Sequence, residues 1–82
     1  MSDAGDQLTV TALWDDEAGV WVAESEDVPG LVTEAATIER LVEKLRVMIP
    51  EMLELNCGLV GQSDVPFRVV AERVARTLQT AA

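Results

Sequence analysis

The sequence predicts a small α+β domain in which an antiparallel β-meander carries one long helix on one of its faces. Two patterns in the chain indicate this class. Apolar and polar residues alternate in the first third of the chain, as they do in half-buried strands; further on, apolar residues recur every three or four positions, as they do in a helix. The length of 82 residues allows one domain, residues 1–82, and a hydrophobic content of 49% is enough for a core.

The first two strands are expected at about residues 7–14 and 20–26, on either side of a tight turn. Gly19 can adopt the positive φ that such hairpins often need. Trp14 and Trp21 flank the turn, so aromatic packing between them is expected to help fix the hairpin.

A second turn and a short third strand complete the meander. Pro29 presets φ for the first central position of a type II turn, and Gly30 accepts the left-handed second position. The third strand is expected at about residues 31–35. Residues 1–6 contain mostly small residues and two acids, and are expected to be a disordered tail.

The strongest periodic signal lies between residues 38 and 55, which are expected to form the helix. Thr37 precedes it as the expected N-cap, and residues 56–58 supply a stop signal that ends in glycine. Pro50 lacks a backbone donor, so a kink or break is expected there. The apolar stripe is wide enough to cover a sheet face; it consists of Ile38, Leu41, Val42, Leu45, Met48, Ile49, Met52 and Leu53.

The segment that begins near residue 66 is ambiguous on periodicity alone. As a strand, it alternates Phe67 and Val69 with the polar Arg68. As a helix, it places Glu72 one turn away from both Arg68 and Arg76, where four-residue ion pairs would support it. The residues themselves leave these two interpretations open.

The net charge of −9, from 15 acidic and 6 basic residues, is unevenly distributed. All nine acidic residues before position 36 occur without a single lysine or arginine. Such a half repels phosphate, which disfavours direct nucleic-acid binding, and it attracts a basic protein partner. The alternative interpretation is that the acids only keep a small protein soluble.

Cysteine usage and hydropathy predict a cytoplasmic protein. The single cysteine, Cys57, excludes an internal disulfide framework and fits a reducing compartment. No signal sequence is visible, and no apolar run reaches the roughly 18 residues that span a bilayer. Because a core of this size is small, a homodimer or higher homo-oligomer is also expected, since self-association buries more apolar surface.

The sequence predicts no catalytic residue, no cofactor and no metal site, and therefore no enzyme. It contains no histidine, and its glycines are scattered singly, which excludes a phosphate-binding loop. Cys57 has neither a histidine nor a second cysteine to work with. Acids on the two sides of the first hairpin leave a residual magnesium-dependent nuclease as the least favoured alternative, because they lack calcium-loop spacing and successive acids point in different directions.

Two sets of residues are therefore expected to matter. The first set is acidic and is the hypothetical partner-binding surface: Asp15, Asp16, Glu17, Glu24, Glu26 and Asp27. The second set is structural: Trp14, Gly19, Trp21, Pro29, Gly30 and Thr37.

Residues 14–23, 27–34 and 37–41 together resemble the HicB-like group, the N-terminal domain of HicB antitoxins. The shared pattern is a hairpin closed by acid-acid-x-x-Gly, a turn of the Asp-x-Pro-Gly type, a Thr-Glu pair and a Thr-capped helix. The chain resembles in particular short stand-alone bacterial members grouped as a domain of unknown function. The resemblance covers roughly residues 8 to 56.

The resemblance implies the element order β-β-β-α-β and a partial ribonuclease H-like fold. That order favours a fourth strand at about residues 66–74 over the helical alternative. HicB antitoxins bind and block HicA, a small basic RNA-cleaving toxin. The resemblance thus implies a non-catalytic protein-binding module, and the acidic N-terminal half complements a HicA-like partner in charge, which favours encounter.

The chain also departs from typical HicB antitoxins, which carry a C-terminal DNA-binding domain. After residue 74 too few residues remain for such a domain, so binding to its own operator is not expected. The alternative function is a stand-alone homo-oligomeric adaptor or regulator without a toxin partner. Neither alternative involves direct nucleic-acid binding or a membrane.

Overall fold

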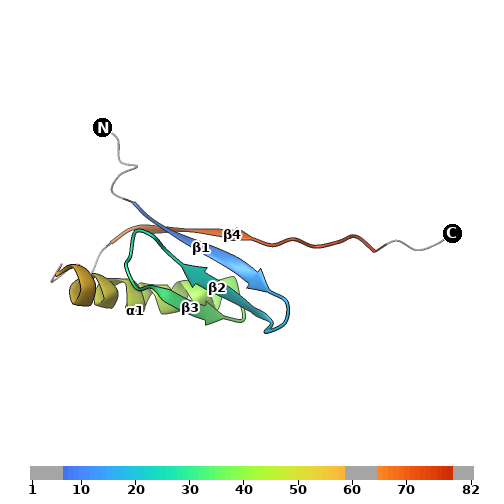
Figure 1. The fold of residues 1–82 in the computed structure, drawn as a ribbon, viewed down its shortest axis with the longest axis horizontal. Helices are drawn as coiled ribbons and strands as arrows, with labels where there is room; N and C mark the ends of the chain where they lie inside the picture. Colours follow the sequence, from blue (N-terminus) through green and yellow to red (C-terminus); the bar gives the residue numbers. More distant parts are fainter. Residues whose placement is uncertain (1–6, 59–64, 79–82) are drawn as a thin grey trace.

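The computed structural model describes residues 7–58 and 65–78 and shows an α+β fold, as expected. Four strands form one sheet in the order β3-β2-β1-β4, and one long helix lies against one face of it (Figure 1). The element order β-β-β-α-β is also the expected one. The elements are β1 (Leu8–Asp15), β2 (Val20–Glu24), β3 (Val32–Ala35), α1 (Ile38–Cys57) and β4 (Phe67–Glu72).

The β1–β2 hairpin forms as the turn residues predict. Gly19 has a φ of 70°, and its N–H donates to the Asp15 carbonyl at 2.8 Å. Trp14 lies opposite Trp21 in the antiparallel register, and their rings meet edge to face with centroids 5.3 Å apart. This aromatic pair therefore packs across the end of the hairpin next to the turn.

The turn before β3 has the expected type II geometry. Gly30 has a φ of 83°, and the Leu31 N–H donates to the Val28 carbonyl at 3.1 Å. Val28 and Leu31 are buried, and the Asn56 side chain donates to the Pro29 carbonyl at 3.0 Å. The turn is thus fastened to the C-terminal end of α1.

β2 ends at Glu24, two residues before the predicted end of that strand. The Ser25 hydroxyl donates to the Thr9 carbonyl at 2.6 Å, and the Thr9 N–H donates to the Asp27 carboxylate at 2.9 Å. Side chains therefore satisfy the backbone of β1 where the strand ladder stops. Because these side chains bond the backbone of Thr9, the chain can leave the sheet after Glu24 and turn toward β3.

Helix α1 begins and ends with the caps that the sequence predicts. The Arg40 N–H donates to the Thr37 hydroxyl at 3.1 Å. At the other end Gly58 is left-handed, and its N–H donates to the Leu53 carbonyl. Of the kink or break expected at Pro50, the break does not occur, because Ile49 and Leu53 are both buried in the core and hold the two halves of the helix in place.

The core lies between α1 and the sheet. The helix contributes a stripe of residues at four-residue spacing, which packs against small and β-branched residues of the strands and against the turn before β3. The buried residues are Val10, Ala12, Ala23, Val28, Leu31, Ala35, Leu41, Leu45, Ile49 and Leu53.

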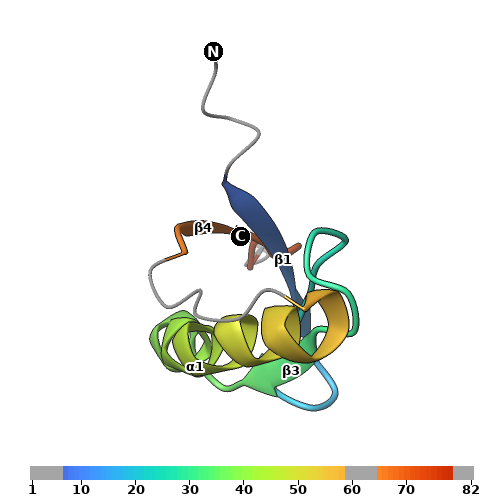
Figure 2. The same cartoon turned by 90° about the vertical axis from the view of Figure 1, so that its left-hand side faces the viewer.

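The ambiguous C-terminal segment is a strand, β4, which pairs with β1 in parallel from Leu8–Phe67 to Leu13–Glu72. The meander itself is antiparallel, but β4 is parallel to β1 because the long helix carries the chain back across the sheet before it re-enters. β4 ends at Glu72, two residues before the predicted end, and residues 73–78 continue as an extended segment (Figures 1 and 2).

Two further expectations concern the N-terminal tail and membrane-spanning segments. The tail predicted at residues 1–6 lies outside the described residues. Within residues 7–58 and 65–78, no helix combines the length and the apolarity that crossing a bilayer requires.

Candidate protein-binding surface

The sheet has one face that α1 covers and one that it leaves open. Val10, Ala12, Ala23 and Ala35 point toward the helix and are buried. Because side chains alternate along a strand, their neighbours in the register point to the opposite side. We call this side the open face; it consists of Thr9, Thr11, Leu13, Val22, Glu24, Val32, Glu34, Arg68, Val70 and Glu72.

The open face mixes exposed apolar side chains with carboxylates. Leu13 is 46% exposed, Val32 64% and Val70 45%. Glu34 and Glu72 lie on either side of the Leu13–Val22 pair across the four strands. Exposed apolar side chains framed by charges are typical of protein-binding surfaces, in which an apolar centre is surrounded by a polar rim.

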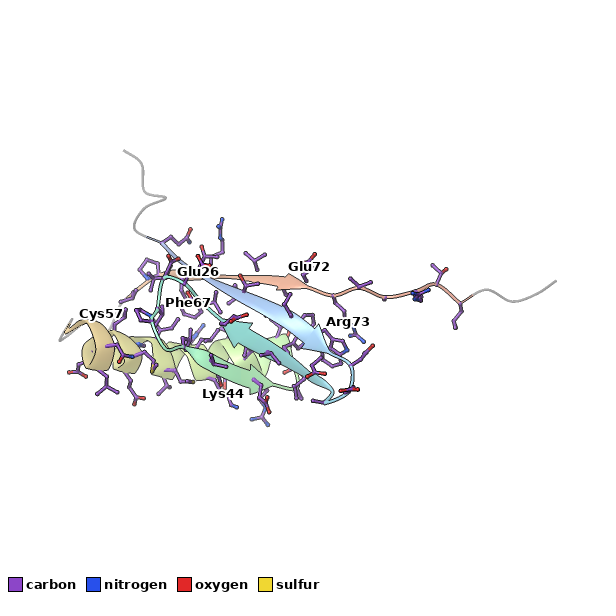
Figure 3. All side chains as sticks on the ribbon, viewed as in Figure 1. Glu26, Lys44, Cys57, Phe67, Glu72 and Arg73 are labelled. Carbon is purple, nitrogen blue, oxygen red and sulfur yellow. The ribbon has the colours of Figure 1, made fainter. Side chains whose placement is uncertain are left out.

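A hollow of about 490 Å³ lies at the end of the open face where β1 begins. Figure 3 shows Glu26 and Phe67 at this end of the sheet, and Glu72 and Arg73 toward the other. The side chains that line the hollow are hydroxyls and carboxylates, from Thr9, Thr11, Glu24, Ser25, Glu26 and Asp27. An opening with this lining can accept a lysine or arginine side chain from a partner.

The structure separates the six acidic residues expected at the partner surface into two groups. Asp15, Asp16 and Glu17 lie at the β1–β2 turn, whereas the other three lie at the opposite end of the hairpin. Glu24 pairs with Thr11, four residues before Asp15, which is roughly 13 Å along the strand. Among the described residues, no three side chains of metal-binding type lie close enough to hold one ion.

Half of these carboxylates already have partners within the chain. Asp15 accepts from the Glu17 N–H at 3.0 Å and from the Ala18 N–H at 3.2 Å. Asp16 accepts from the indole N–H of Trp14 at 2.6 Å. Asp27 accepts from the backbone of β1, as described above. These three acids therefore shape the turn and the loop.

The remaining three acids, Glu17, Glu24 and Glu26, are exposed, and no hydrogen bond to any of their carboxylates is found in the described part of the chain. Glu24 and Glu26 both belong to the hollow. They are consequently the acidic side chains best placed to meet a basic partner.

Two features of the surface were not anticipated from the sequence. The Arg73 guanidinium lies over the Trp14 ring, 4.2 Å from its centroid, and links the end of β4 to the first hairpin. Ser25 bridges β1 and the following loop. A serine two residues before an aspartate at a strand end is a local signal for such a turn, whereas nothing local indicates the contact of Arg73 with Trp14.

Comparisons with known proteins identify the family. The family model of DUF1902, a domain of unknown function, matches residues 7–81. A crystal structure of the hypothetical protein TTHA1013 from the extremely thermophilic bacterium Thermus thermophilus is similar, with 52% sequence identity and a TM-score of 0.64; the match covers 89% of this chain and 99% of that one. No curated protein matches the chain. Because the family model spans every strand and the helix, this chain belongs to the DUF1902 family.

Proposed function

We propose that this protein is a non-catalytic, cytoplasmic binding module of the HicB type, which neutralises a small basic RNA-cleaving toxin. The observation that carries the proposal is the open face, where exposed apolar side chains lie beside carboxylates that have no partner within the described chain. A basic protein is attracted by the charge and then buries the apolar side chains. The element order β-β-β-α-β supports the same assignment, and with it a partial ribonuclease H-like fold.

The proposed contact divides between the two parts of this surface. Glu24 and Glu26 in the hollow receive lysine or arginine side chains of the toxin. Leu13 and Val22 in the middle of the sheet supply apolar contact. A rigid sheet loses little conformational entropy when a partner docks, which favours binding over a surface built from loops.

The alternative function, a stand-alone homo-oligomeric adaptor or regulator, is favoured by a different observation. Val74 is 85% exposed and Leu78 97% exposed in the extended segment that follows β4. Apolar side chains exposed to this extent are suited to self-association. This alternative predicts that the protein purifies from its host without a basic partner.

The first experiment is purification of the tagged protein from its host at low salt, with identification of co-purifying proteins by mass spectrometry. We expect a small basic protein at near-equal stoichiometry, and the protein alone would contradict the antitoxin proposal. Association rates of the purified pair are then measured for a Glu24→Gln, Glu26→Gln double variant. We expect an association rate about threefold lower or more at low salt, with the difference vanishing at high salt.

The matched control is the Glu51→Gln, Glu54→Gln double variant, which makes the same change of net charge on the exposed side of α1. If the hollow is the contact, the control binds nearly as fast as the unaltered protein. An equal loss of rate in both variants would show that only the net charge matters and would remove Glu24 and Glu26 from the contact.

A further inference from the structure

The two outer edges of the sheet are protected to different degrees. The β3 edge is only four residues long, and the Lys44 ammonium donates to the Glu34 carbonyl at 2.6 Å. A short strand with a lysine on its edge is a common means of preventing association between sheets. The β4 edge is six residues long, and within residues 7–58 and 65–78 no hydrogen bond reaches its outer side.

The register of β4 shows which of its backbone groups face outward. The Leu8 N–H donates to the Pro66 carbonyl, so the backbone of Pro66 faces β1. Backbone groups alternate in direction along a strand, and those of Phe67, Val69 and Ala71 therefore point away from the sheet. These residues present a regular row of donors and acceptors that can pair with another strand.

Neither the helix nor the rest of the described chain covers this edge. The backbone of α1 approaches β3 and β2 most closely, toward the other edge of the sheet. Val70 is 45% exposed, and the segment that follows β4 runs away from the domain with Val74 and Leu78 exposed (Figure 1). Such an edge is a template for strand addition.

We propose that β4 pairs antiparallel with β4 of a second copy, about a two-fold axis that passes through Val70. An axis perpendicular to the sheet joins the two four-stranded sheets into one, with both helices on the same side. In this register, Arg68 of each copy lies opposite Glu72 of the other. The outward-facing Val69 and Ala71 exchange the backbone hydrogen bonds between the copies.

The charges of β4 select this register over its neighbours. Moving the axis to Val69 or Ala71 places Arg68 opposite Val70 or Val74, and both ion pairs are lost. Within one copy, Arg68 and Glu72 are four residues apart on an extended strand, roughly 13 Å, and cannot meet. The Arg68 guanidinium instead donates to the Thr9 hydroxyl of β1 at 3.4 Å, and it turns outward to reach Glu72 of a second strand. In the proposed register, Arg68 and the second copy's Glu72 occupy a non-hydrogen-bonded pair, the kind in which cross-strand side chains approach most closely.

This interface uses Arg68, Val70 and Glu72 at the β4 side of the open face, and it does not use the hollow or the Leu13–Val22 pair of the proposed toxin contact. The hollow formed around Glu24 and Glu26 is lined by β1, the end of β2 and the loop that follows it, and by no residue of β4. A dimer would therefore present two copies of the proposed binding surface on one continuous sheet.

The test is a charge exchange followed by mass measurement in solution, by light scattering and sedimentation of the full chain. We expect a dimer at micromolar concentration for the unaltered protein. Arg68→Glu or Glu72→Arg alone places like charges opposite each other twice, so the dissociation constant should rise roughly tenfold or more. The Arg68→Glu, Glu72→Arg double variant should restore the original value.

Arg46→Glu is the control, because it makes the same charge change as Arg68→Glu on the exposed side of α1, away from β4. It should leave the dimer intact. A second variant, Ala71→Pro, removes one outward N–H while preserving the groups that face β1, and should give a folded monomer by circular dichroism. A monomeric unaltered protein, or a double variant that fails to recover the dimer, would overturn the proposal.

Discussion

Gly30 is constrained by both its backbone conformation and its neighbours. Its φ of 83° is strained for an L-residue, and a Cβ placed there would lie 3.0 Å from the Met52 methyl group and 3.2 Å from the Asn56 amide nitrogen. We expect Gly30→Ala to lower the free energy of unfolding by about 1–2 kcal/mol for the left-handed backbone alone, and by more for the contact. Urea unfolding followed by tryptophan fluorescence measures this change.

Gly19→Ala is the matched comparison, because Gly19 has a φ of 70° but no atom within 4 Å of the added Cβ. It should show the backbone cost alone. Equal losses in the two variants would mean that the ends of the Met52 and Asn56 side chains move aside at no cost.

At the residue scale, the sequence predicted the groups whose roles are local. Gly19, Gly30 and Thr37 act through their own turns or cap, and the structure places each as expected. The roles of Asp15 and Asp16 were not predicted, because a carboxylate that accepts from nearby N–H groups looks, in sequence, like a free surface charge. The hydrogen bonds of these carboxylates show that a run of acids at a hairpin can be part of the turn.

Among the elements, α1 is the one whose sequence conflicts most with its structure. Pro50 lies inside a helix of 20 residues, where the Arg46 carbonyl lacks its usual backbone donor. We expect Pro50→Ala to raise the free energy of unfolding by about 1–3 kcal/mol, because alanine restores the donor and relieves the ring clash. Thermal and urea unfolding check the prediction. Glu51→Ala, an exposed neighbour, should change stability by less than about 0.5 kcal/mol.

A loss of stability in Pro50→Ala would show that the helix uses the ring as a packing group, since Pro50 is half-buried. The same conflict explains why a break was predicted. Pro50 by itself favours an interruption of the helix. The apolar stripe of α1 is buried both before and after Pro50, and its burial stabilises the helix by more than the proline destabilises it. β2 and β4 end before the residues that their alternation predicts for a related reason. Beyond Glu24, the Ser25 and Asp27 side chains bond the backbone of β1 in place of a strand.

The whole molecule carries a net charge of −9, most of it on exposed side chains. Folding brings these charges together, so their mutual repulsion opposes the compact state. At fixed protein concentration, raising sodium chloride from about 20 mM to about 0.3 M should increase the melting temperature by about 4 °C or more. A smaller increase is expected for the Glu51→Gln, Glu54→Gln variant, and a decrease in the unaltered protein would contradict the prediction.

The arrangement of the elements was less predictable than the elements themselves. Periodicity predicted three strands and the helix, but left residues 67–72 between strand and helix. The pairing of β4 with β1 depends on contacts between Phe67 and Leu8, far apart in sequence, which no local window contains. The residues of the open face can be predicted from strand alternation once the buried side is known. The separation of the acids into two groups cannot be predicted without the pairing register of β1 and β2.

The position of β4 has a consequence for how the domain is made. β1 is synthesised before every other element of the sheet, and the strand that completes its outer side is synthesised after all of them. The growing chain therefore carries β1 with one bare edge until β4 has left the ribosome, even when the hairpin and the helix are already in place. The period of greatest exposure to proteases and to misassembly falls before that strand emerges.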